Sequence, residues 1–93
     1  MKDISFSQLE EAFEVAKKRK FKYFAVRIQM DGFPKDELQL NLIENIDTKM
    51  EYMRKTYDEG LQHKFSPAIR IVDYAAGDRV EGIMKALYPE EVI

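Results

Sequence analysis

Hydrophobic residues recur with two different periods along the chain, and the changes of period divide it into six elements. Over residues 5–20 the apolar side chains are three or four positions apart, which places them on one face of an amphipathic helix. Ser5 and Gln8 have the spacing of a capping box, so we expect the helix to begin there. The apolar positions of this face are Phe6, Leu9, Phe13 and Ala16.

The period becomes two in the next stretch, which predicts a β-hairpin. From Phe24 to Met30 every second residue is apolar, and residues 31–35 contain the glycine and the proline of a chain reversal. Alternating leucines over residues 38–42 then predict a return strand that pairs antiparallel with the first. Leucine is a weak strand former, so a helix over residues 36–46 is the alternative interpretation.

A second helix is expected over residues 47–59. Thr48 and Glu51 repeat the capping-box spacing, and Gly60 can adopt the left-handed conformation that ends many helices. The apolar positions, again three or four apart, are Ile46, Met50, Met53 and Tyr57.

The last third of the chain predicts one more strand and one more helix. Residues 68–74 are rich in β-branched side chains, and Asp78 with Glu81 marks the start of a helix that Pro89 ends. The order α-β-β-α-β-α predicts an α+β fold with a three-stranded sheet packed with helices in a two-layer sandwich, one sheet face being more exposed. If the third strand pairs parallel through the second helix, that crossover should be right-handed.

Length and composition restrict the class of protein. The 93 residues weigh 11.0 kDa, enough for a single domain over residues 1–93, and 45% of them are apolar. There is no cysteine, which excludes disulfides, thiolate metal sites and cysteine nucleophiles. We expect a cytoplasmic protein that does not enter the membrane, because no long apolar run and no leader peptide is present.

Charge is unevenly distributed along the chain. Residues 1–30 carry seven basic and four acidic groups, whereas residues 36–60 carry three basic and seven acidic ones. The chain can therefore present fields of opposite sign to a partner or to a copy of itself. The formal net charge is −2, so the chain as a whole does not have the basic character typical of nucleic-acid-binding domains.

No set of residues predicts catalysis or metal binding. His63 is the only histidine, and we interpret it as a loop residue. Asp31, Asp36 and Glu37 lack the spacing of a calcium loop. Asp78 is interpreted as a helix cap. We therefore expect no catalytic residues, no metal and no cofactor.

Basic residues gather at the end of the first helix and supply one alternative function. They could follow a phosphate backbone, with the neighbouring Tyr23 available for stacking on bases, or they could remain solvated and complement the helix dipole. The residues of this basic cluster are Lys17, Lys18, Arg19, Lys20 and Lys22.

Aromatic and long side chains on the strands supply the other candidate site. Tyr23 and Ala25 share the outer face of the first strand, and Arg70, Val72 and Tyr74 share a face of the third. Tyrosine and arginine are favoured in interface cores. The sequence therefore predicts a non-catalytic module that binds a protein partner or a second copy of itself, with nucleic-acid binding through the basic cluster as the alternative.

Three stretches carry a resemblance. Val26 to Pro34, Asn45 to Asp58 and Ile69 to Tyr74 resemble small uncharacterised proteins encoded by phages and prophages of Gram-positive bacteria. The resemblance implies an accessory or packaging component acting in the host cytoplasm. It implies no chemistry, since no position matches a known functional residue.

Overall fold

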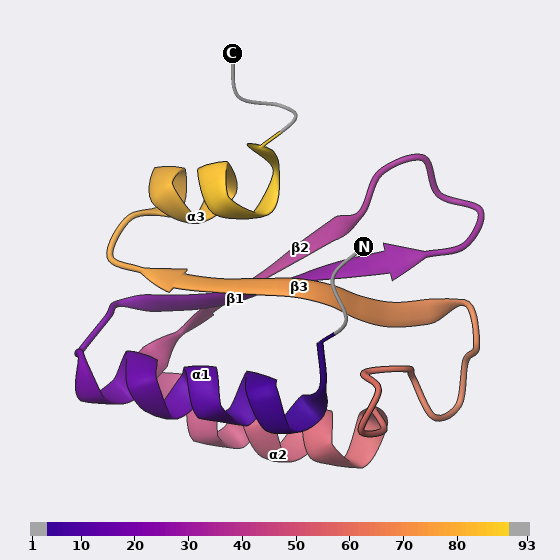
Figure 1. Ribbon diagram of the computed structural model, residues 1–93, viewed down its shortest axis with the longest axis horizontal. Helices are drawn as coiled ribbons and strands as arrows, with labels where there is room; N and C mark the ends of the chain where they lie inside the picture. The colour runs from indigo at the N-terminus through magenta and orange to yellow at the C-terminus, as the bar shows by residue number, and fades with distance from the viewer. Residues whose placement is uncertain (1–3, 90–93) are drawn as a thin grey trace.

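The computed structural model describes residues 4–89 and contains three α-helices around a three-stranded sheet (Figure 1). The elements in chain order are α1 (Phe6–Lys18), β1 (Tyr23–Met30), β2 (Glu37–Leu42), a 3₁₀ turn η1 (Ile43–Asn45), α2 (Ile46–Thr56), β3 (Ile69–Gly77) and α3 (Val80–Leu87). The predicted α+β class and the order α-β-β-α-β-α are confirmed. None of the described helices is long and apolar enough to cross a bilayer.

The sheet has the strand order β2-β1-β3, and both outer strands lie antiparallel to β1. The predicted hairpin is confirmed, with Tyr23 opposite Leu42 and Ile28 opposite Glu37. The alternative helix over residues 36–46 is wrong; only the short turn η1 is helical there before α2 begins. Since β3 is antiparallel to its neighbour, the parallel pairing is not formed.

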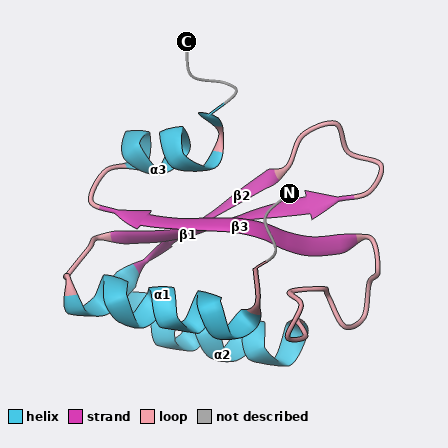
Figure 2. Ribbon diagram, in the orientation of Figure 1, coloured by secondary structure: helices cyan, strands magenta, loops and turns pink. Residues whose placement is uncertain are grey.

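Helices cover both faces of the sheet to different extents (Figure 2). α1 and α2 form one layer beneath it, and the main core lies between that layer and the sheet. The shorter α3 lies on the opposite face, where Ile83, Leu87 and Tyr88 cover Ala25 in a second, smaller cluster. This second face is the one with exposed large apolar side chains on its strands, as the sequence indicated for one face of the sheet.

Arg27 in the centre of β1 connects α3 to the sheet. Its Nε lies 2.6 Å from Oδ2 of Asp36, and its Nη1 donates to the carbonyl oxygen of Leu87 at the end of α3. The guanidinium also stacks 4.4 Å above the ring centre of Tyr88, whose hydroxyl donates to the carbonyl of Asp36 at 3.1 Å. α3 is therefore held by polar contacts of one strand residue as well as by apolar packing.

β3 contains a bulge that changes which face its residues occupy. Ile28 pairs with Ile71 and Arg27 pairs with Asp73, so Val72 has no partner in the register. Ile71 and Tyr74 consequently both lie on the face covered by α1 and α2, although they are three residues apart. The sequence placed Arg70, Val72 and Tyr74 on one face of this strand, and that prediction is wrong because Tyr74 shares a face with Ile71.

The helix ends follow the sequence in one case and depart from it in the others. The capping box of Ser5 and Gln8 is formed, with both bonds present. α2 begins at Ile46, three residues after η1 starts, so Thr48 lies inside the helix and does not cap it. α2 also ends at Thr56 instead of residue 59, because Tyr57 is extended and bridges to His63.

Two predicted caps are replaced by other residues. The left-handed conformation expected of Gly60 occurs at Leu61, with φ of 64°, where a fully buried side chain compensates the steric cost. The N-cap of α3 is Arg79, which makes no side-chain cap bond. Asp78, the predicted cap, instead accepts a hydrogen bond from the backbone N–H of Lys22 at 3.0 Å.

Lys20 follows the end of α1 in the left-handed region, with φ of 58°, where glycine is the favoured residue. We expect Lys20→Gly to raise the free energy of unfolding by about 1 kcal/mol, because it removes this steric cost. Glu11→Gly, at an exposed position in the middle of α1, is the matched control and should lower that free energy by about 1 kcal/mol. Urea denaturation measures both, and a destabilised Lys20→Gly variant contradicts the prediction.

Candidate functional site

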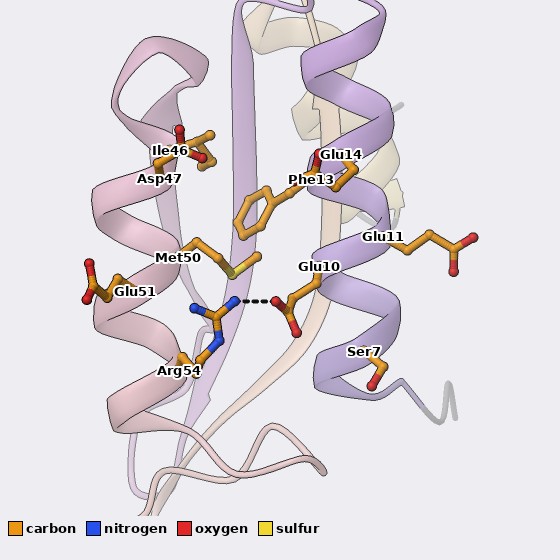
Figure 3. Close-up of a pocket in the computed structure, with 10 residues that line it drawn as sticks. All are labelled: Ser7, Glu10, Glu11, Phe13, Glu14, Ile46, Asp47, Met50, Glu51 and Arg54. Carbon is orange, nitrogen blue, oxygen red and sulfur yellow. Dashed lines mark hydrogen bonds and ion pairs between the residues drawn. The ribbon is translucent and has the colours of Figure 1, made fainter.

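A groove of about 500 Å³ between α1 and α2 is the first candidate for a site (Figure 3). Its floor is apolar, formed by Phe13, Ile46 and Met50. Figure 3 shows Glu10 and Arg54 reaching toward one another across the gap, while Glu11 and Glu51 point away from it on the outer sides of the helices. The acidic side chains around the groove therefore do not converge on one point.

Ion pairs join the two helices across the groove. Glu10 pairs with Arg54, and Nζ of Lys17 lies 2.9 Å from Oδ1 of Asp47 and 3.8 Å from Oε1 of Glu14. The hydrogen bond from Lys17 to Asp47 and the charge of Asp47, with a smaller effect of Glu14, raise the pKa of Lys17 above its ordinary value. The groove is thus a contact between two helices that ion pairs hold together, and its lining keeps more acidic than basic side chains.

The chemistry available in the described part of the chain is limited. Among residues 4–89, no three histidine, cysteine, aspartate or glutamate side chains lie together so that they could hold a metal ion. His63 lies between the rings of Tyr57 and Phe65, and its Nδ1 accepts the backbone N–H of Phe65 at 3.1 Å. These contacts order the segment around His63, which the sequence placed in an exposed loop and which the structure shows half-buried and bridged to Tyr57.

The basic cluster is not a uniform surface. Lys17 is engaged by Asp47 across the groove, and the ammonium of Lys22 lies 5.5 Å from the ring centre of Tyr23. Lys18, Arg19 and Lys20 are exposed where α1 ends. Nucleic-acid binding through this cluster stays a prediction, for which the affinity should fall steeply between about 50 and 200 mM salt.

The five residues predicted to form an interface lie on two faces of the sheet. Tyr23 packs with Ala25 in the cluster beneath α3, where Ala25 is fully buried. Tyr74 lies on the other face and stacks on Phe24, with ring centres 6.0 Å apart. Arg70 lies in the strand between Ile69 and Ile71, whose side chains belong to the main core. Val72 is the extra residue of the bulge. The bulge separates the members of this group, so they do not form one continuous surface.

The leucines of β2 form an apolar row on the second face, which we call the leucine row: Leu38, Leu40 and Leu42. In the register, Leu40 pairs with Ala25 and Leu38 with Arg27, which places the row on the side of α3. Leu38 is partly covered by α3, but Leu40 and Leu42 are 38% and 39% exposed. The sequence pattern contained this row, but the face it occupies follows only from the register.

The backbone of the leucine row also lies at an edge of the sheet. The N–H of Ile43 donates to the carbonyl of Lys22 at 3.0 Å, which marks that pair as hydrogen-bonded. Hydrogen-bonded pairs alternate with non-bonded ones in an antiparallel ladder. The backbone N–H and C=O groups of Leu38, Leu40 and Leu42 therefore point outward, away from β1.

Comparison of the chain with protein-family models, with curated proteins and with solved structures found no match. The resemblance to phage-encoded proteins and the cytoplasmic location therefore stay predictions.

The raised pKa of Lys17 leads to a testable pH effect. Because the folded chain holds this proton more tightly than the unfolded chain, the stabilisation is present below the unfolded pKa and is lost as the pH rises through the folded pKa. Asp47→Asn should lower the pKa of Lys17, measured by NMR titration of its side chain. Glu14→Gln is the control and should lower it less, since its effect on Lys17 is the smaller one. An unchanged Lys17 in Asp47→Asn contradicts the assignment.

Proposed function

We propose that the chain is a non-catalytic interaction module that associates with itself through the leucine row of β2. The observation that carries the proposal is the coincidence of exposed leucine side chains with outward-pointing backbone groups on one edge strand. Burying such side chains is favourable, at about 25 cal/mol for each Å² of apolar surface removed from water. The open backbone groups add directional hydrogen bonds to that apolar contact.

The distribution of charge supports a second copy as the partner. Lys17, Lys20 and Lys22 lie around the Leu42 end of β2, where they outnumber the one acid, Glu44, in the lining of a shallow pocket. The opposite end of β2 begins with the exposed acid Glu37. A strand with one basic and one acidic end is complementary to its own copy when the two run in opposite directions.

Sedimentation equilibrium over a range of protein concentrations tests the proposal. The unmodified chain should pass from 11.0 kDa to twice that mass as the concentration rises. Leu42→Lys should weaken association by at least about tenfold, because each copy loses apolar burial and gains a charge in the interface.

Val15→Lys on α1 is the matched control, because Val15 is 43% exposed and lies outside the leucine row. It should associate as the unmodified chain does. A chain that remains at the mass of one copy throughout, or a control that weakens association as much as Leu42→Lys, rules the proposal out.

A further inference from the structure

We infer that the open half of β3 binds an extended segment of a partner protein, which joins the sheet as a strand parallel to β3. Two alternate side chains of this segment fill a hollow between β3 and α1. The site lies at the opposite edge of the sheet from β2, so it is separate from the proposed self-association. The free backbone groups, the hollow beside them and the charges at its two ends carry the inference.

The edge of β3 is covered over its first half and open over its second. The N–H of Ile71 donates to the carbonyl of Leu61 at 2.9 Å. The carbonyl of Ile69 accepts the N–H of His63 at 3.0 Å, so the segment before β3 protects the first half. Over residues 74–77, within the described part of the chain, no backbone group from outside the sheet bonds to this edge. Open edge groups of this kind are suited to an added strand.

The pairing of β1 shows which backbone groups of the open half point outward. Lys22 bonds to the side of β2, so Ala25, three residues further on, bonds to the side of β3, where its partner is Ala75. The backbone groups of Ala75 therefore point into the sheet. Those of its neighbours Tyr74 and Ala76 point outward.

One of the outward groups is already used, and this restricts the direction of the added strand. The N–H of Tyr74 donates to Oδ1 of Asp73 at 2.9 Å. The groups that remain are, in chain order, the carbonyl of Tyr74, the N–H of Ala76 and the carbonyl of Ala76. In a parallel pair one residue donates to a carbonyl and accepts from the N–H two positions further on, so a parallel strand needs only these three groups. An antiparallel strand would also need the N–H of Tyr74.

A hollow of about 430 Å³ lies beside these groups, between β3 and α1. Its apolar walls are formed by Ala12, Val15, Phe21, Phe24, Tyr74 and Ala76. Tyr74 and Ala76 have their side chains on the face that α1 and α2 cover. Neighbouring residues of paired strands point to the same face, so the two partner residues beside Tyr74 and Ala76 direct their side chains into the hollow. The partner segment is therefore apolar at these two alternate positions.

The helix beside this edge favours a single segment as the occupant. α1 packs beneath the sheet next to β3 (Figure 1). A second copy joined edge to edge through β3 would bring its own α1 to about 5 Å from this one, closer than the roughly 8–10 Å between packed helices. An extended segment without a helix beneath it avoids this collision and needs only the hollow.

Charges along α1 define the ends of the partner segment. Glu11, Val15 and Lys18 follow one flank of the helix, because they are four and three residues apart. Figure 3 shows Glu11 pointing away from α2, and its carboxylate has no hydrogen bond or ion pair with residues 4–89. α1 and β3 run in the same direction (Figure 1), so Glu11 lies toward the start of the open half and Lys18 toward its end. A parallel segment that fits has a basic residue first, two alternate apolar residues next and an acidic residue last.

Titration of the isotope-labelled chain with the peptide Lys-Thr-Val-Thr-Val-Thr-Glu, followed by NMR of the backbone amides, tests the inference. The amides of Val15, Tyr74 and Ala76 should shift. N-methylation of the central threonine removes the N–H that donates to the carbonyl of Tyr74 and should weaken binding by about tenfold. N-methylation of the first valine is the matched control, because in a parallel strand its N–H points away from β3, and it should leave the affinity unchanged. The peptide with its lysine and glutamate exchanged should bind about threefold more weakly.

Two variants of the chain separate this site from the proposed self-association. Val15→Lys places a charge over the hollow and should weaken peptide binding by at least about tenfold. The variant should fold, because Val15 is already 43% exposed, and its amide spectrum checks this. Leu42→Lys, which should weaken self-association, should bind the peptide as the unmodified chain does.

The outcomes divide as follows. Shifts along the open half of β3, lost with the central threonine methylated and kept with the first valine methylated, support the parallel added strand. Absence of shifts at this edge at millimolar peptide overturns the inference, and so do shifts confined to Leu40 and Leu42. Equal weakening by both methylations, or loss through the first valine alone, overturns it as well. A chain that binds the peptide but never exceeds the mass of one copy keeps this inference and rules out self-association.

Discussion

The rest of the structure depends on the burial of β1 on all sides. Phe24, Ala25 and Val26 are consecutive and all have no exposed surface, so the strand needs an apolar layer above and below it as well as a strand on each edge. α1 and α2 supply the lower layer, and α3 supplies part of the upper one. α3 is short and covers the central strand before it covers β2, which leaves two leucines of the outer strand exposed.

Local patterns in the sequence predicted the helices and strands well, because each element has a characteristic spacing of apolar residues within its own stretch of chain. The face of α1, the capping box at Ser5 and the hairpin all depend on residues close together in the chain. The bulge at Val72 could not be predicted in this way, since it exists only in relation to β1. The same holds for Leu61, whose left-handed backbone is tolerated because its side chain is buried among distant residues.

The candidate site shows the same division between local and non-local information. The sequence indicated an interaction surface and opposed charges, and it identified Tyr23 and Ala25 as residues of the second face. It joined them to Tyr74, which the bulge moves to the opposite face. The leucine row was visible as an alternation, but an alternating strand has two faces, and only the pairing of Leu40 with Ala25 decides which one the leucines occupy.

The polar contacts that Arg27 makes with the end of α3 have a consequence for the order in which parts of the domain unfold. α3 is the shortest α-helix and belongs to the smaller apolar cluster, and the guanidinium of Arg27 links its end to β1 beside that apolar packing. Such an element can open as a unit while the larger cluster keeps its packing. The order of amide exchange should therefore begin with the C-terminal helix, and the uncovering of Ala25 that accompanies it would enlarge the apolar strip beside β2.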